Sequence, residues 1–196
     1  METPMDIVID EEIKFEVITE TGVQRQDLIS IKRKCLSISV TLSNMLVESL
    51  STGSCDFRIS IPVHEIAFIQ VKDYLENIYP NLSENEKKVA QKPLLDKSEK
   101  ISQREYDFIR GVDVQSPDKK TLITLLEAAN YLDIAPLLYL VARHIVSHIK
   151  GKTPDEIRKS FGMLNNWTPE AYAKAVEQLN GTFSPSDSST ENKASQ

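Results

Sequence analysis

The stretch that decides the fold of this chain is Leu125–Phe161, LLEAANYLDIAPLLYLVARHIVSHIKGKTPDEIRKSF. Apolar residues recur every three or four positions through its first two segments, so each predicts a helix with one buried face. Asp133 and Pro136 mark the start of the second helix. The apolar positions are Leu122, Leu125, Ala129 and Leu132 in the first helix, and Leu138, Val141, Ile145 and Ile149 in the second.

Two short helices are predicted after Gly151, which ends the second helix. Thr153-Pro154-Asp155-Glu156 supplies a threonine cap, a proline at the first helical position and a glutamate that completes a capping box. Thr168-Pro169-Glu170 repeats much of this pattern. Helices shorter than about 12 residues are marginal in water, so something must cover their apolar sides. They either fold back on the preceding domain or leave a surface open for another protein.

Alternation of apolar and polar residues predicts strands in the N-terminal third. Ile13, Phe15 and Val17 alternate with charged residues, and the turn at Thr21-Gly22 allows Val23–Ile31 to return as a second strand. Phe57–Ile61 shows the same two-residue period, and Pro62 is predicted to end that strand.

Helical periodicity predicts two more helices in this half. One follows Ser39 as N-cap and carries Leu42, Met45, Leu46 and Leu50. The other carries Phe68, Val71, Leu75 and Ile78, and ends at Tyr79-Pro80. Residues 81–103 hold nine charged side chains and few apolar ones, so we expect a mobile loop, with structure restarting near Tyr106. Residues 184–196 contain five serines and predict a disordered tail.

Composition excludes several classes of function. The formal charge of -6, from 29 acidic and 23 basic residues, argues against nucleic-acid and anionic-membrane partners. The longest apolar run, Ile134–Ala142, contains a proline and is far shorter than the roughly 20 residues of a membrane-spanning helix. The first residues lack the pattern of a secretory signal, so we expect an intracellular protein. Cys35 and Cys55 are expected to be unpaired thiols.

The AANYLDI segment and the GKTPDEIRK segment stand at a spacing that resembles one protein family. It is the S-phase-kinase-associated family, the F-box-binding adaptors of SCF (cullin-RING) ubiquitin ligases, whose members carry similar AANYLDI and GKTPEEIRK helices. SVTLSNML at Ser39–Leu46 resembles the family's SVTIKTML. The resemblance implies an α/β protein with a BTB/POZ fold at residues 6–138. It also implies a C-terminal helical F-box-binding extension at residues 139–183.

The resemblance also implies which residues meet partners. The family places the pair corresponding to Asn130 and Tyr131 against the N-terminal helices of the cullin. It places the C-terminal helices against the F-box of substrate receptors. The residues implied to contact the F-box are Ile157, Arg158, Phe161, Met163, Asn165, Asn166, Trp167, Tyr172, Val176 and Leu179.

The match is looser elsewhere, which suggests a divergent paralogue. The opening strands depart from the family pattern, and Tyr106-Asp107 stands where the family has Trp-Asp. The family's closing NQWC is missing, and its tryptophan falls on Gly181. Loss of this aromatic residue is expected to alter receptor affinity or choice.

No catalytic motif is evident, and we expect neither an enzyme nor a cofactor. His144 and His148 lie one helical turn apart, a spacing that can chelate a metal. The sequence reveals no third ligand, so ordinary surface histidines are the favoured interpretation and no metal is expected.

The sequence therefore predicts a cytoplasmic and nuclear adaptor that bridges a cullin and F-box proteins for ubiquitin-dependent degradation. An alternative is a structural F-box-binding or self-associating protein without a cullin, and a weak homodimer is left open. An elongin C-like adaptor shares the BTB/POZ core but lacks the C-terminal helices, so residues 151–179 argue against it.

Overall fold

The computed structural model describes residues 11–18, 28–51, 58–93, 100–115 and 119–163, together with Thr168, Glu170, Ala173, Lys174 and Glu177. The chain divides into two compact units, Met1–Gly162 and Met163–Gln196. In the first unit the described residues form a mixed α/β structure, mostly helical, with a three-stranded sheet. In the second unit Glu170, Ala173, Lys174 and Glu177 are helical.

The sheet has the strand order β2-β1-β3. Strand β1 (Glu12–Ile18) pairs antiparallel with β2 (Ile29–Lys32) and parallel with β3 (Arg58–His64). Ile13, Phe15 and Val17 are fully buried while their charged neighbours face outward, so the strand predicted there is confirmed.

The prediction that Pro62 ends the third strand is wrong, because β3 continues through Pro62 to His64. The register between β1 and β3 is irregular here, since Glu16 pairs with Ser60 but Ile18 pairs with His64. A proline has no N–H to donate, and it is tolerated at a bulge of an edge strand where no ladder bond is needed. Phe57 and residues 19–27 lie outside the described residues.

Helix α1 (Val40–Ser51) begins where the sequence predicted, after the 3₁₀ turn η2 (Arg33–Ile38). The Ser39 hydroxyl accepts a hydrogen bond from the Leu42 N–H at 3.0 Å, as an N-cap does, and donates to the Leu132 carbonyl.

Helix α2 (Glu65–Asp73) leads into a π turn, η3 (Tyr74–Ile78), and a 3₁₀ turn, η4 (Tyr79–Asn81). The predicted helix end at Tyr79-Pro80 is therefore confirmed.

The mobile loop predicted for residues 81–103 is wrong for most of its described part. Helix α3 (Glu84–Ala90) lies there, and α4 (Gln103–Gln115) begins at its end. Two buried residues, Leu82 and Ala90, anchor α3 to the core despite the many charges between them. The amphipathic pattern is short, but the Ser83 side chain and Glu86 form a capping box that starts the helix.

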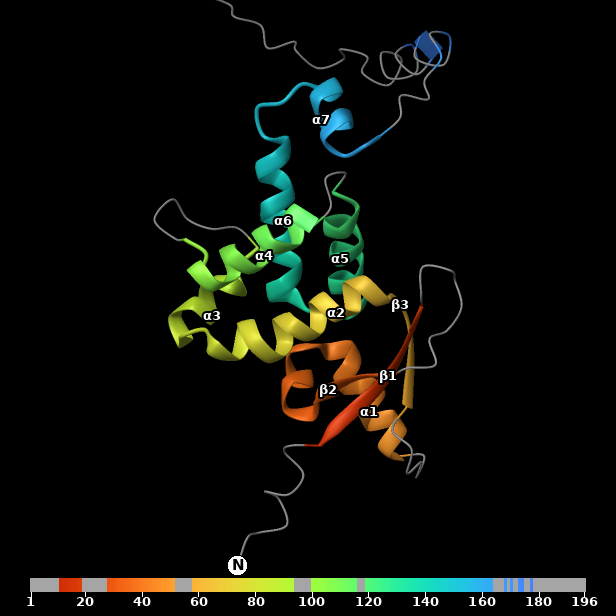
Figure 1. Ribbon diagram of the computed structural model, residues 1–196, viewed down its shortest axis with the longest axis vertical. Coiled ribbons are helices and arrows are strands. Elements are labelled where there is room, and N and C mark those ends of the chain that lie inside the picture. The colour runs from red at the N-terminus through yellow and green to blue at the C-terminus, as the bar shows by residue number, and fades with distance from the viewer. Residues whose placement is uncertain are drawn as a thin grey trace, which may run out of the picture. The chain divides into compact units, whose positions relative to one another are not determined.

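Helices α5 (Lys120–Tyr131) and α6 (Ala135–Ile149) lie side by side (Figure 1). Helix α5 packs against α2 and reaches β3, while α6 packs against α3 and α4. Gly151 has a φ of 76°, the left-handed conformation that glycine adopts readily. Helix α6 ends shortly before it, as predicted. Helix α7 (Pro154–Ser160) follows with seven residues. Helix α6 is continuous across residues 138 and 139, so the division between a core and an extension there stays a prediction.

Within the described ranges, no helix combines the length and apolar character that a membrane span requires.

Candidate partner-binding surfaces

The first candidate surface lies at the C-terminal end of α5, where Asn130 and Tyr131 are both exposed. Tyr131 keeps 41% of its surface accessible, while Ala128 and Ala129 on the same helix are buried. The Thr41 hydroxyl donates to the Tyr131 carbonyl at 3.1 Å, and Ser39 donates to the next carbonyl. These two bonds tie the end of α5 to the start of α1, so the exposed pair is held on a fixed backbone.

Tyr131 also lines an open groove between β3 and α5. One wall comes from the end of β3 and the other from α5. The residues that line it are Pro62, Val63, His64, Thr124, Glu127, Ala128 and Tyr131. A half-exposed tyrosine beside a groove is the kind of broad, rigid contact residue that protein interfaces favour.

The second candidate surface begins at α7, whose capping box is formed as predicted. The Thr153 side chain accepts from the Glu156 N–H at 3.4 Å, and the Glu156 carboxylate accepts from the Thr153 N–H at 2.7 Å. The Thr153 hydroxyl donates to the same carboxylate at 2.9 Å. Hydrogen bonds from the backbone and side chain of Thr153 lower the pKa of Glu156.

This lowered pKa predicts that α7 loosens in acid. Because the pKa of Glu156 is lower in the folded helix than in the unfolded chain, its stabilisation is complete above the unfolded pKa and is lost as the pH falls through the folded value. Amide hydrogen exchange in residues 154–160, corrected for intrinsic rates, should therefore accelerate on acidification. Glu156→Gln should abolish most of this pH dependence, whereas Asp155→Asn, which leaves the box intact, should preserve it.

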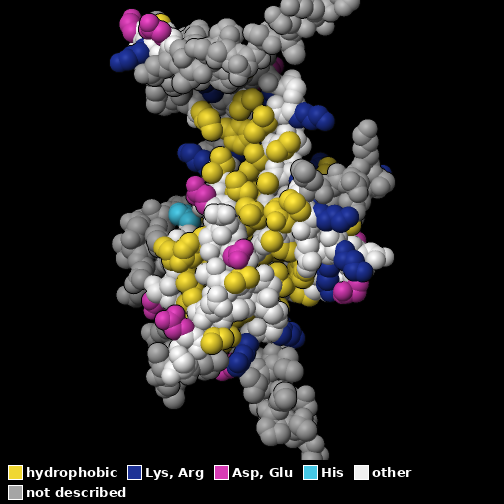
Figure 2. Space-filling view, turned by 180° about the vertical axis from the view of Figure 1, so that it is seen from behind, with side chains coloured by type: hydrophobic (Ala, Val, Ile, Leu, Met, Phe, Trp, Pro, Cys, Tyr) yellow, Lys and Arg dark blue, Asp and Glu magenta, His cyan; other side chains and the backbone are white. Residues whose placement is uncertain are grey.

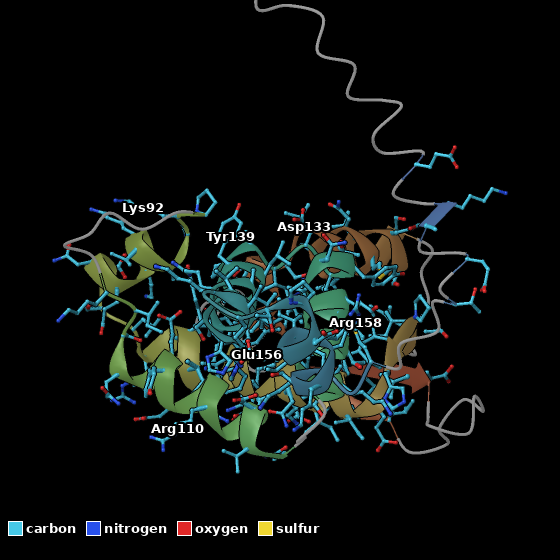
Figure 3. The ribbon with its side chains drawn as sticks, turned by 90° about the horizontal axis from the view of Figure 1, so that it is seen from above. Lys92, Arg110, Asp133, Tyr139, Glu156 and Arg158 are labelled. Carbon is cyan, nitrogen blue, oxygen red and sulfur yellow. The ribbon has the colours of Figure 1, made fainter. Side chains whose placement is uncertain are left out.

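The described F-box-contact candidates differ in how much of their surface is exposed. Ile157 and Arg158 are half-buried, and the Arg158 guanidinium pairs with Asp155 at 2.6 Å within the helix. Phe161 is only 7% exposed in the chain without a partner, although it is not part of the core cluster. Met163, at the start of the second unit, is exposed. Viewed from above, Glu156 and Arg158 lie on α7, and Asp133 and Tyr139 lie on the side opposite Arg110 (Figure 3).

The last turns of α6 add apolar surface that the sequence analysis missed. Val146 is 57% exposed and Ile149 is 38% exposed, although Ile149 was predicted to lie on a buried side. Figure 2 shows hydrophobic side chains gathered along the part of the molecule that α6 occupies. The sequence does contain a sign of this exposed apolar surface. Apolar residues occur on several sides of α6, which is unusual for a helix with one solvated face.

The other F-box-contact candidates lie outside the described residues: Asn165, Asn166, Trp167, Tyr172, Val176 and Leu179.

Comparison with known proteins identifies the family. Residues 135–180, which include α6 and α7, match the Skp1 family, dimerisation domain. The chain is 34% identical over 147 residues to "SCF ubiquitin ligase complex protein SKP1a" of Dictyostelium discoideum, an alignment that covers 74% of this chain and 83% of that protein. The chain belongs to the Skp1 family. It is also 30% identical over 164 residues to "S-phase kinase-associated protein 1 homolog" of Tetrahymena thermophila, covering 81% of this chain and 94% of the relative.

Some Skp1 relatives match more closely over a shorter region. "SKP1-like protein 20" of Oryza sativa subsp. japonica is 53% identical over 53 residues, or 27% of this chain and 30% of that protein. The shorter alignment has higher identity than the two longer ones.

One further cluster in this Skp1-family chain has the side chains of a metal site. The Asp113 carboxylate of α4 lies beside both histidines of α6, with Oδ2 at 3.3 Å from His144 Nε2 and 3.1 Å from His148 Nε2. The sequence analysis found no third ligand because Asp113 is 35 residues from His148. Burial lowers the pKa of His148, with His144 and Lys119 adding to the effect and Asp113 opposing it. Burial alone would raise the pKa of Asp113, but Lys119 and the histidines outweigh it and lower that pKa.

Proposed function

We propose that this chain is a non-catalytic adaptor subunit of an SCF-type ubiquitin ligase, bridging a cullin scaffold to F-box substrate receptors. The observation that carries the proposal is 34% identity, over most of both chains, to a protein named as an SCF ubiquitin ligase complex protein. An adaptor supplies proximity and orientation, so its function requires binding surfaces and no reactive groups.

A BTB/POZ fold for residues 6–138 is part of this proposal. The three-stranded sheet flanked by helices is consistent with such a core, and the buried residues of the sheet and of α2, α5 and α6 form one continuous cluster. Residues 139–183 would form the F-box-binding extension, and residues 184–196 a tail. The protein would act in the cytoplasm and nucleus, where F-box receptors meet their substrates.

The two proposed surfaces lie on different elements. Asn130 and Tyr131, beside the groove at the end of α5, would contact the cullin. Ile157 and Arg158 of α7 would contact the F-box together with the exposed Val146 and Ile149 of α6. Met163, in the second unit, is a separate candidate for F-box contact. Phe161 would contribute to the same F-box surface, although it is only 7% exposed in the chain alone.

Reconstitution tests the proposed function directly. The full chain is mixed with a purified F-box protein and with the N-terminal domain of a cullin, and the mixture is separated by gel filtration. One peak that contains all three proteins is expected only when this chain is present. Retention of the F-box protein without the cullin would favour the alternative of an F-box-binding protein outside any ligase, and binding of neither would overturn the proposal.

A single side chain of α7 tests the F-box surface. Ile157→Ala removes apolar contact area from a half-buried position and is expected to weaken F-box binding about five- to tenfold. Val47→Ala, which truncates an exposed aliphatic residue of α1, is the matched control and should leave the affinity unchanged. Titration calorimetry with one F-box protein measures both. Equal affinities for the two variants would exclude Ile157 from the interface.

A further inference from the structure

Three side chains from two helices bring their ligand atoms together on one side of α6. Asp113 Oδ2 lies 3.1 Å from His148 Nε2 and 3.3 Å from His144 Nε2. The two Nε2 atoms are themselves 3.3 Å apart. The three atoms therefore form a nearly equilateral triangle whose corners are an oxygen and two imidazole nitrogens.

The edges of this triangle match those of a tetrahedral zinc site. Two ligand atoms bound to zinc at about 2.0–2.1 Å and separated by a tetrahedral angle lie about 3.3–3.4 Å apart. A Zn²⁺ ion above the triangle could thus reach all three atoms with little movement of the side chains. Two imidazoles and one carboxylate also favour zinc over Mg²⁺ or Ca²⁺, which prefer oxygen ligands alone.

The surroundings leave room for such an ion. The three side chains retain between 13% and 23% of their exposure, so the site is sheltered but open to water on one side. Lys119 Nζ contacts the other carboxylate oxygen, Asp113 Oδ1, at 2.7 Å. This contact leaves Oδ2 free to ligate and holds the carboxylate in place, as outer-shell partners of metal ligands do.

We propose that Asp113, His144 and His148 bind a Zn²⁺ ion, with water at the fourth position, and that the ion clamps α4 to α6. The clamp would join the C-terminal end of α4 to the part of α6 that leads toward α7. This site is independent of the adaptor function and requires neither a cullin nor an F-box protein.

Metal binding by the full chain tests the proposal. The protein, freed of metal with a chelator, is titrated with Zn²⁺ in competition with a chromogenic chelator, and its melting temperature is followed with and without Zn²⁺. The test variants are His144→Gln with His148→Gln, and separately Asp113→Asn. His64→Gln, which changes the remaining histidine of the chain, is the matched control.

The wild type and the His64→Gln variant are expected to bind one equivalent of Zn²⁺ and to melt at a higher temperature when it is present. The double histidine variant should lose about 100-fold or more in affinity, and Zn²⁺ should no longer raise its melting temperature. The Co²⁺-loaded wild type should show the visible absorption of a tetrahedral site without a thiolate charge-transfer band, a result that does not depend on the variants folding. Absence of Zn²⁺ uptake by the wild type, uptake that survives the double substitution, or a thiolate band would overturn the proposal.

Discussion

The double variant Asn130→Lys with Tyr131→Lys is expected to lose cullin binding while its affinity for an F-box protein stays within about twofold of the wild type. Both side chains are exposed at the end of α5, so lysine can be accommodated there without disturbing the core. At the proposed interface the change removes a tyrosine contact and buries two unpaired charges. Losses of this kind at an interface centre reach about 100-fold or more in affinity.

The control for this double variant uses the same two substitutions elsewhere. Asn85→Lys with Tyr106→Lys introduces the same charge on α3 and α4, and Tyr106 is 42% exposed where Tyr131 is 41% exposed. This control should bind both partners normally. Surface plasmon resonance with immobilised cullin N-terminal domain, and then with an F-box protein, measures each affinity. Loss of both partners from a variant that remains folded would show that the two-surface assignment is wrong.

The helix starts show how far local sequence determines this fold. The threonine–glutamate pattern at Thr153 and Glu156 correctly predicted the start of α7 and its capping bonds. The same pattern occurs at Ser83 and Glu86 before α3, which was predicted as loop. The high charge density of that segment argued against an ordered helix. The capping box and the two buried residues Leu82 and Ala90 are nevertheless sufficient to hold α3 in place. A local hydrogen-bonding signal was the better guide than average composition.

Contacts between distant residues set the limit of prediction. The spacing of His144 and His148 was visible in the sequence, but nothing near them pointed to Asp113, which the packing of α4 on α6 brings within 3.1 Å. Likewise, the apolar spacing of α6 did not show that the core ends before Ile149. Periodicity gives the face of a helix that is apolar, whereas the reach of the neighbouring elements decides how much of that face is covered.

A buried polar network around Glu105 is expected to make this residue essential for stability. Its carboxylate is 1% exposed, and Oε1 accepts from the Tyr74 hydroxyl at 3.2 Å. Oε2 accepts from the Ser102 hydroxyl at 3.1 Å and from the Ser102 N–H at 3.4 Å, while the Ser102 hydroxyl accepts from the Glu105 N–H at 3.2 Å. Glu105 therefore completes the hydrogen-bonded cap at the start of α4. It also accepts the hydrogen bond of the buried Tyr74 hydroxyl in η3, the turn that follows α2.

Arg143 of α6 gives the Glu105 carboxylate a second role. In the described part of the chain its two terminal nitrogens are buried without a hydrogen-bond partner, and its Nε donates to the Tyr139 carbonyl at 3.0 Å. Burial lowers the pKa of Arg143, and the negative charge of Glu105 opposes that shift. Because the charge of Glu105 favours the charged form of Arg143, removing it should add to the loss of its hydrogen bonds.

Glu105→Ala is therefore expected to lower the free energy of unfolding by about 3 kcal/mol. Glu105→Gln keeps an acceptor for Tyr74 but removes the charge, so it separates the two contributions and should cost about half as much. Urea unfolding of both variants, with unchanged m-values, gives the comparison. If the two losses are equal, the charge opposite Arg143 dominates over the hydrogen bonds. A loss below about 1 kcal/mol for Glu105→Ala would mean that water replaces the carboxylate, and that α4 is held by its apolar face alone.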